Sequence, residues 1–422
     1  MMAIDGLDAA MLAAAAPTIM AEWDLDKATF GIIFAASQFG VVAGAMLLGY
    51  LSDRFGRRGL VIGAVLVSGI ATICAPLASH AFGLAVLRLI AALAIGGLRV
   101  TIYALVVETA PKRMRATVVG TAFVGYSAGQ ILCGALAGLV LPSLGWRALF
   151  FVGGGISIAA AVVAYLTIQE SWRFLAGQPH RRLELIARLK EKGIDVPDDA
   201  RFQLLDEGKV EPARTFMPSD LFRGRLRWLT PLFWASEILC VVVSSFYINW
   251  MPIIAKSIGA STQQAAYSLS VFAAGTMVGP LLITRLVDRL GPRSIVAATV
   301  AAAACYASVS FLTLDRSSIL PFAFCFGAFA LGVQMSLASL AMQFYPSTIR
   351  ANATGWYMFV GGLGSVSSPV LVGHLLGAGM PSAELLVLTA LPMLVLAPVA
   401  WIVAHQYRAG EIPGDGGPEH TE

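Results

Sequence analysis

Long apolar runs dominate this sequence and limit its possible folds more than any other feature. A helix needs about 20 mostly apolar residues to cross a bilayer, at a rise of about 1.5 Å per residue. Runs of that length cover residues 3–22, 28–51, 60–78, 82–108, 116–141, 146–168, 228–255, 263–286, 294–314, 317–343, 352–378 and 382–406. Because lipid satisfies no backbone polar group, we expect these twelve runs to be membrane-spanning α-helices.

The charge content agrees with a membrane protein. Charged residues make up 13% of the chain, against about 25% in soluble proteins, which is too little polar surface to cover the molecule in water. The five cysteines all lie within apolar runs. We interpret them as small core residues rather than as disulfides or metal ligands, and we expect no metal and no cofactor.

An internal repeat divides the chain in two. The turn at 49–58 (GYLSDRFGRR) recurs in reduced form at 288–293 (DRLGPR), so that Asp53, Arg54, Gly56 and Arg58 each reappear 235 positions later. The same offset relates Pro111 to Pro346, Arg115 to Arg350, Gly120 to Gly355, Gly129 to Gly364 and Gly138 to Gly373. A constant offset indicates two halves built alike.

The repeat and the apolar runs together predict the domain organisation. We expect a six-helix bundle at 1–168, a charged linker at 169–227, a second six-helix bundle at 228–406 and a disordered tail at 407–422. The fold class is an all-α membrane protein with twelve transmembrane helices in two pseudo-symmetric halves.

The distribution of basic residues predicts the orientation. With the termini inside, the inner loops and tail hold 23 of the 29 Lys and Arg residues, and the outer loops hold 4. Basic residues favour the cytoplasmic side. We therefore expect a multi-pass protein of the cytoplasmic (inner) membrane with both termini in the cytoplasm.

The turn at 49–58 resembles the signature loop of the major facilitator superfamily, Gly-x-Leu-Ala/Ser-Asp-Arg-x-Gly-Arg-Arg/Lys, which implies that superfamily's transporter fold. We expect Asp53 to face a helix N-terminus and accept from arginines, and Arg57 and Arg58 to meet anionic lipid or carboxylates of the other half. Alternatively, these charged residues only follow the preference of basic residues for the cytoplasmic side, around a tight turn. The predicted conformational latch comprises Gly49, Asp53, Arg54, Gly56, Arg57, Arg58, Glu108 (with Arg113 or Arg115), Asp288, Arg289, Arg293 and Arg350.

Acidic residues inside apolar runs are candidates for proton coupling. Asp5 and Asp8 are three residues apart and share a helical face. Two close carboxylates in a low dielectric cannot both ionise easily, so such a pair is suited to carry a proton. Alternatively, the helix dipole favours acids near a helix N-terminus. Glu237 is a third candidate, either as a proton carrier or as an arginine partner.

Asp5-Gly6-Leu7-Asp8 also resembles a motif of the aromatic acid:proton symporter family. Further matches are Gly96-Gly97, the run Glu108–Pro111–Arg113–Arg115, Gly145-Trp146-Arg147, the run Glu170–Ser171–Arg173–Phe174–Leu175, Trp250–Pro252, and the run Tyr345–Pro346–Arg350. This resemblance implies uptake of benzoate-like, hydroxybenzoate-like, phenylpropionate-like or muconate-like acids with protons.

Two positions depart from that family's pattern. Gly362 stands where the family often has an arginine, and Arg99 appears after the glycine pair of the fourth run. A buried arginine needs a partner, and its fork binds a carboxylate through two parallel N–H bonds. We infer that Arg99 supplies the cation for a carboxylate substrate; a permanent pair with Asp8 or Glu237 is the alternative. Arg88 resembles the superfamily's arginine in the fourth helix, or snorkels towards the interface.

The remaining substrate-site candidates are polar or aromatic residues of runs that the superfamily fold implies at the centre, or of the neighbouring fifth and eleventh runs. With Arg99, the predicted substrate-binding set comprises Tyr103, Tyr126, Gln130, Asn249, Trp250, Gln334 and Trp356.

These features predict a secondary transporter, a proton-coupled symporter of an organic, aromatic carboxylate working by alternating access. The partners are that small molecule, protons and the lipid bilayer, with no nucleic acid, and we expect a monomer. No nucleotide-binding loop or catalytic constellation occurs, so we expect neither ATP-driven transport nor an enzyme. The alternatives are a drug/proton antiporter, a carrier of another small metabolite and a non-transporting sensor. Drug/proton antiporters typically have a Gly-Pro pair in the fifth helix, and the Gly129-Gln130 pair found here counts against that alternative.

Overall fold

The structure is a computed structural model that describes residues 1–111, 114–178, 181–191, 193–194, 196–197, 202, 217–310 and 318–408. In this described part the chain is helical, apart from turns and short connections, and contains no strand. The α-helices are α1 Met2–Trp23, α2 Lys27–Phe55, α3 Arg57–Cys74, α4 Ala81–Thr109, α5 Arg115–Thr167, α6 Trp172–Ala176, α7 Arg182–Glu191, α8 Leu226–Ser257, α9 Thr262–Leu290, α10 Arg293–Ala307, α11 Ile319–Gln343, α12 Ser347–Gly377, α13 Ser382–Leu388 and α14 Ala390–Arg408.

Ten helical segments of the described part are long and apolar enough to cross a membrane. One of them, α5, holds two spans joined at Gly145, where the chain reverses. Gly145 has a φ of 76°, which glycine adopts without the strain that a residue with a side chain would have. The shorter apolar helix α10 supplies a further span. With these additions, the twelve predicted spans and the fold class are confirmed, although residues 311–317, at the ends of two predicted spans, lie outside the described residues.

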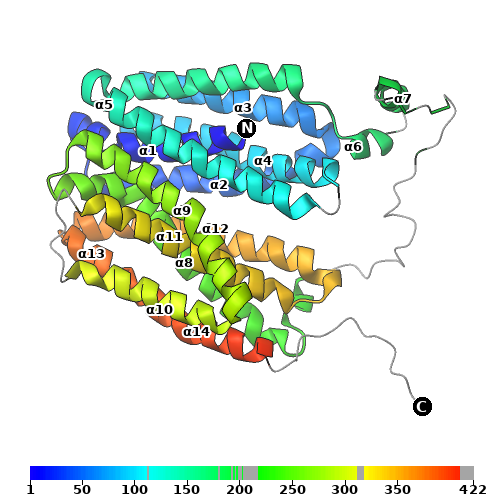
Figure 1. Cartoon of the computed structure of the whole chain (residues 1–422). Coiled ribbons are helices and arrows are strands. Elements are labelled where there is room, and N and C mark those ends of the chain that lie inside the picture. Colours follow the sequence, from blue (N-terminus) through cyan, green and yellow to red (C-terminus); the bar gives the residue numbers. More distant parts are fainter. Residues whose placement is uncertain are drawn as a thin grey trace, which may run out of the picture.

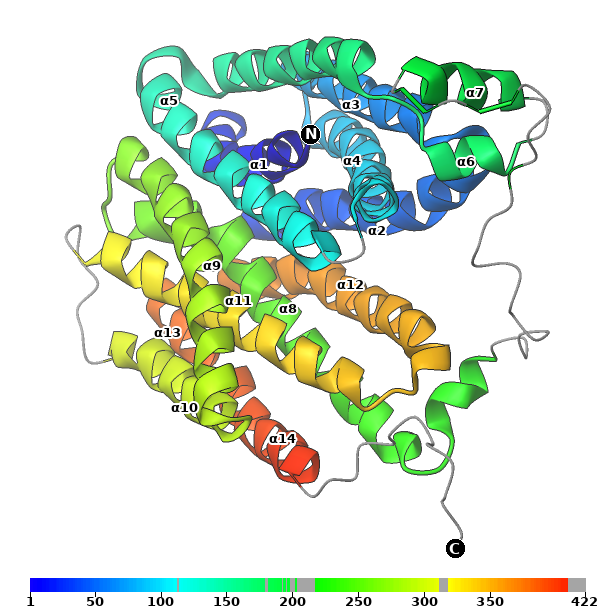
Figure 2. The same ribbon diagram turned by 45° about the vertical axis from the view of Figure 1, so that its right-hand side comes forward.

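The helices form two groups (Figures 1 and 2). Helices α1–α5, the first half, pack on one another mainly as α2 with α4, α1 with α5, and α3 with both α4 and α5. Helices α8–α14, the second half, pack mainly as α9 with α11, α8 with α12, and α10 with α14. Much of the predicted linker, including residues 203–216, and the tail from residue 409 onward lie outside the described residues.

The two repeated turns lie at the same end of the helices, which we call the turn end. Gly56 has a φ of 100° and Gly291 a φ of 82°, so both positions adopt backbone conformations that glycine accepts without strain. At the opposite end, the far end, lie the turns at Gly145 and Gly259. Asp26 caps α2 there by accepting from the backbone N–H of Thr29, and this bond holds the pKa of Asp26 below its usual value.

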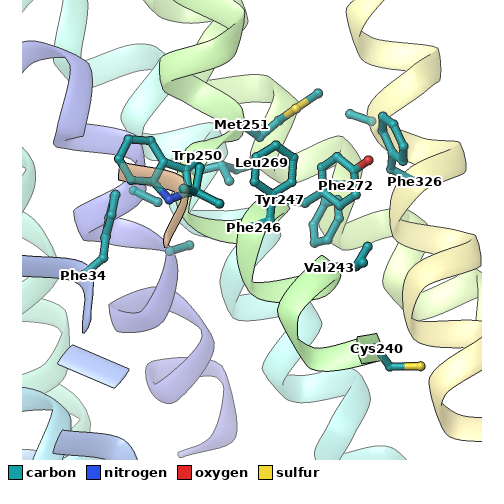
Figure 3. Packing of buried hydrophobic residues seen from close by; sticks show 14 of the residues in the cluster. Phe34, Cys240, Val243, Phe246, Tyr247, Trp250, Met251, Leu269, Phe272 and Phe326 are labelled. Carbon is teal, nitrogen blue, oxygen red and sulfur yellow. The ribbon is translucent and has the colours of Figure 1, made fainter. Parts of the chain in front are cut away.

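Contacts between the halves run from the far end to the middle of the helices. Helix α2 packs on α12, and α5 packs on α9. Gly31 lies against the backbone of Pro369, and Ser270 Oγ donates to the carbonyl of Ile131 at 2.8 Å. The Phe34 and Trp250 rings meet edge to face with centroids 5.6 Å apart, as Figure 3 shows. These contacts join the halves near the far end.

Candidate functional site

A central cavity of about 270 Å³ lies between the halves. Helices α1, α2, α4 and α5 of the first half line it, together with α8, α9, α11 and α12 of the second. The cavity is slightly smaller than the roughly 300–1,000 Å³ typical of pockets for drug-sized ligands. Its size is therefore suited to a small molecule such as a single-ring acid.

Asp8 and Arg88 form a sealed pair at the cavity wall. Arg88 Nη1 donates to Asp8 Oδ1 and Nη2 to Oδ2, each at 2.9 Å, and Nη2 also donates to the Asp8 carbonyl at 3.2 Å. Thr72 of α3 donates to Asp8 Oδ1 at 3.0 Å. Both charged side chains are only 3% exposed. This pair therefore ties α1 to α3 and α4.

Asp5 and Arg99 form a second pair, which is open to the cavity. Arg99 Nε donates to Asp5 Oδ2 at 2.7 Å, and Nη2 to Oδ1 at 2.8 Å. The Asp5 side chain is fully buried, but that of Arg99 is 32% exposed. The guanidinium carbon of Arg99 lies 5.0 Å from the centre of the Tyr126 ring. An anion entering the cavity can therefore reach Arg99 beside an aromatic surface.

Gly6, between the two aspartates, explains the form of the Asp-Gly-x-Asp motif. A Cβ atom on Gly6 would collide with the carbonyl oxygen of Tyr126 on α5. Gly129 of α5 is placed in the same way against the Ala3 carbonyl. Helices α1 and α5 therefore pack backbone to backbone at this level, and only glycine permits that approach.

Three expectations about these charges need correction. The aspartates were expected to act as a mutual acid pair, but each has its own guanidinium, because α4 presents both Arg88 and Arg99 towards α1. The partner of Arg99 is Asp5, rather than Asp8 or Glu237. Arg88 does not snorkel, since it is 2% exposed.

Glu237 of α8 does not line the cavity itself, but it contacts Gln334, which does. Gln334 Nε2 donates to Glu237 Oε1 at 2.9 Å, and Tyr357 lies near the same carboxyl group. Glu237 Oε2 is buried and makes no hydrogen bond within the described residues. No arginine pairs with Glu237 among the residues that the structure describes, and the proton-carrying role stays a prediction.

Six of the eight predicted substrate-binding residues line the cavity: Arg99, Tyr103, Tyr126, Gln130, Asn249 and Gln334. Trp250 does not, because it is fully buried against Phe34 where the halves meet. Trp356 does not either, because it stacks on Trp234 with ring centres 6.0 Å apart. The sequence reasoning missed Ser37 and Gln38, which line the cavity from α2. The signal in the sequence that could have identified Ser37 and Gln38 is that they are adjacent polar residues inside an apolar run.

The turn end contains a network built within the first half. Arg57 Nη2 lies 2.7 Å from Glu108 Oε1, and Ser171 Oγ donates to Glu108 Oε2 at 2.7 Å. Glu170 Oε1 accepts from the backbone N–H groups of Arg57 at 2.9 Å and Arg58 at 3.2 Å, so it caps α3. The network ties α3, α4 and the segment before α6 together.

This network bears on two of the contacts expected of the latch. Glu108 pairs with Arg57, because the start of α3 lies next to the end of α4, and the expected pairing of Glu108 with Arg113 or Arg115 stays a prediction. The acceptors found for Arg57 and Arg58 among the described residues belong to the first half or to the segment just after it, and they include the Tyr165 carbonyl at 2.8 Å from Arg58 Nη2. Arg113 and the side chains of Asp53 and Arg115 lie outside the described residues.

The other latch candidates occupy simpler surroundings. Arg350 donates through Nε and Nη2 to the Tyr345 carbonyl at 3.2 and 3.1 Å, bracing the turn before α12. Arg54 is exposed and lies over the Phe55 ring. Gly49, Asp288, Arg289 and Arg293 lie at the turn end, with Asp288 beside a small cleft next to Gly291. Within the described residues, no group of three or more His, Cys, Asp or Glu side chains is placed to hold a metal ion.

The sequence of this chain is similar to those of known transport proteins. The chain is 29% identical over 405 residues to the 4-hydroxybenzoate transporter PcaK of Pseudomonas putida, covering 95% of this chain and 89% of that protein. It is 28% identical over 396 residues to the gallate transporter of Pseudomonas putida (93% and 87%). It is also 28% identical over 404 residues to the 3-(3-hydroxy-phenyl)propionate transporter of Escherichia coli K12 (95% and 91%).

Solved structures show the same fold. The inward open conformation of the xylose transporter XylE from E. coli superposes with a TM-score of 0.73 at 16% identity, covering 95% of this chain and 93% of that one. An inward-facing bacterial homologue of the human lysosomal transporter Spinster superposes with a TM-score of 0.72, also at 16% identity (97% and 95%). A model of the Major Facilitator Superfamily matches residues 1–405, so the chain belongs to that superfamily and is a multi-pass membrane transporter.

Proposed function

We propose that this protein is a secondary transporter that takes up an aromatic carboxylate together with protons. The observation that carries the proposal is Arg99, a guanidinium that reaches the central cavity while its fork holds Asp5. A substrate carboxylate has the same shape and charge as the Asp5 side chain, so it can take over the same two N–H donors. The similar proteins named for gallate, 4-hydroxybenzoate and 3-(3-hydroxy-phenyl)propionate transport suggest the same substrate class.

Competition for Arg99 supplies a coupling mechanism. An ionised Asp5 occupies the guanidinium and excludes a second carboxylate. Protonation of Asp5 neutralises it and frees Arg99 for the substrate anion, so that proton and acid bind together. When Asp5 loses its proton, it competes again for Arg99 and displaces the acid. We therefore assign proton carriage to Asp5, with Glu237 as a further candidate, and stacking of the aromatic ring to Tyr126 and Tyr103, which line the same cavity.

Alternating access would proceed by rocking of the two halves about this cavity. The distribution of Lys and Arg favours a cytoplasmic turn end in the cytoplasmic membrane, with both termini inside. Contacts such as Ser270 with Ile131 then close the outer side in the present state. The arginine network at the turn end would brace the first half as it moves.

Uptake into liposomes with an imposed pH gradient tests the proposal. Wild-type protein should accumulate benzoates when the outside is acidic, and much less when the gradient is absent. Asp5→Asn should still bind the acid, because Arg99 is then permanently available, but should exchange it without a response to the pH gradient. Asp26→Asn is the matched control, since asparagine also caps a helix and residue 26 lies outside the cavity.

Two outcomes would contradict the proposal. Accumulation of the acid by Asp5→Asn in response to the gradient, at the wild-type level, would exclude Asp5 as the proton carrier. Failure of every benzoate, phenylpropionate and muconate to enter with wild-type protein would exclude the substrate class. Export of an uncharged or cationic compound against an inward proton flow would instead favour the drug/proton antiporter.

A further inference from the structure

The internal repeat relates Arg99 to a residue on the other side of the cavity. The offset of 235 positions that joins the two turns carries Arg99 onto Gln334. Arg99 lies on α4 and Gln334 on α11, and both line the central cavity. Each also holds a buried carboxyl group, Asp5 in the first half and Glu237 in the second. The second half therefore repeats the arrangement with a neutral amide in place of the guanidinium.

Gln334 has hydrogen-bonding capacity to spare. One N–H of its amide donates to Glu237 Oε1 at 2.9 Å, and its Oε1 accepts from Ser244 Oγ at 3.3 Å. A glutamine amide has two N–H donors. Within the described residues the second N–H has no partner, so it is available to a ligand in the cavity.

Asn249, on α8, also lines the cavity from the second half and offers the complementary group. Its Nδ2 donates to the carbonyl of Ser245 at 2.7 Å and to Ser245 Oγ at 3.1 Å. These bonds fix the amide so that Oδ1 is its remaining polar atom, and Oδ1 makes no hydrogen bond with the described residues. A donor from Gln334 and an acceptor from Asn249 together match a hydroxyl group, which both accepts and donates.

We propose that Gln334 and Asn249 form a subsite for a ring hydroxyl of the acid whose carboxylate Arg99 binds. The preferred substrates are thus hydroxylated aromatic acids rather than benzoate itself. This inference rests on the proposed function and adds to it the chemical class of the substrate's second substituent.

A second carboxylate does not fit this wall. The cavity residues contributed by the second half are all uncharged. Glu237 lies directly behind Gln334, where an ionised carboxyl would repel an anion. A hydroxyl group carries no charge and needs only the unused donor and acceptor. The two halves therefore divide recognition between an anion site and a neutral polar site.

Uptake of matched acids into proteoliposomes tests the subsite. The acids are benzoate and its 2-, 3- and 4-hydroxy derivatives, measured as competing pairs so that the readout is a ratio. Wild-type protein should prefer at least one hydroxybenzoate over benzoate. Gln334→Leu should reduce that preference roughly 2- to 10-fold, the effect of one net hydrogen bond.

Gln343→Leu is the matched control, because it makes the same change on the same helix away from the cavity. Asn249→Ala is the second variant and should lower the same hydroxybenzoate-to-benzoate ratio. It tests the subsite if Gln334→Leu does not fold. Equal wild-type uptake of all four acids, or a ratio unchanged in the folded variants, would overturn the subsite while leaving aromatic acid transport in place. If wild-type protein carries none of the four acids, and no phenylpropionate or muconate either, the proposed function fails and the subsite with it.

Discussion

The two acid–arginine pairs on α1 use the same groups in different surroundings. In both, an arginine of α4 holds an aspartate of α1 through two N–H bonds. Asp8 and Arg88 are each 3% exposed, whereas Arg99 is 32% exposed and faces the cavity. The difference indicates that access, not the chemistry of the pair, separates a structural contact from an exchangeable one.

The consequences of breaking the pairs differ because arginine and aspartate differ in how they lose charge. Removing Asp8 leaves a buried guanidinium, which cannot release its proton in a protein. Removing Arg99 leaves a buried carboxyl, which can take up a proton and become neutral. The sealed pair should therefore control stability, and the open pair should control binding.

The largest expected effect follows from Asp8→Ala. Breaking a buried pair by deleting one partner costs about 3–5 kcal/mol, so thermal unfolding in detergent should occur at a much lower temperature and expression should fall. The double variant Asp8→Leu with Arg88→Met should recover most of this loss, because no unpaired charge is left in the interior. A stable Asp8→Ala protein would mean that the Asp8–Arg88 pair does not hold α1 in place.

Arg99→Ala should instead weaken acid binding strongly, with little loss of stability. Charge-assisted hydrogen bonds contribute about 1.5–3 kcal/mol each, so affinity should fall at least roughly 10-fold. Arg99→Lys should lie between wild type and Arg99→Ala, because lysine keeps the charge but loses the two-pronged geometry. Equilibrium binding and thermal unfolding measured on the same samples separate the two effects. Tight binding by Arg99→Ala would remove Arg99 from the substrate site.

The fold could be predicted from the sequence because its determinants are local. A run of about 20 apolar residues is visible without knowledge of its neighbours, and the repeated turn at 288–293 reveals the duplication. Gly56 and Gly291 both adopt the positive φ that a tight turn requires. The chain reversal at Gly145 likewise falls in the predicted gap between the runs 116–141 and 146–168.

The site could be predicted only in part, because contacts between helices are not local. Asp5 and Asp8 share a face, but which residues of α4 meet them depends on how α1 and α4 pack. The available signal was the spacing of Arg88 and Arg99, 11 residues or about three helical turns apart, which puts both on one face. Trp250 and Trp356 do not line the cavity, and the sequence could not show this, because an aromatic residue that packs against another helix looks the same in sequence as one that lines a cavity.

Gly6→Ala should disturb both acid–arginine pairs at once, with a smaller loss of stability than Asp8→Ala. The added methyl group would meet the Tyr126 carbonyl and push α1 away from α5. Overpacking of this kind typically costs about 1–3 kcal/mol, and the displaced α1 should also weaken acid binding, since Asp5 and Tyr126 both adjoin Arg99. Gly155→Ala is the matched control, because a Cβ atom there meets nothing within 4 Å. Equal unfolding temperatures for the two variants would show that the close approach of α1 to α5 is not required.

Thr72→Val should have the smallest effect and gives the sharpest test of the comparison. It removes one hydrogen bond to Asp8 and leaves both bonds from Arg88 in place, so the loss of stability should be about 0.5–1.5 kcal/mol. Thr299→Val is the control, since among the described residues that buried hydroxyl bonds only to the Ile295 carbonyl of its own helix. If the Asp8–Arg88 pair is purely structural, the rate of acid uptake per folded Thr72→Val molecule should equal that of wild type. A slower rate at unchanged affinity would instead mean that Asp8 changes partner during transport, and the sealed pair would then belong to the transport cycle as much as the open one.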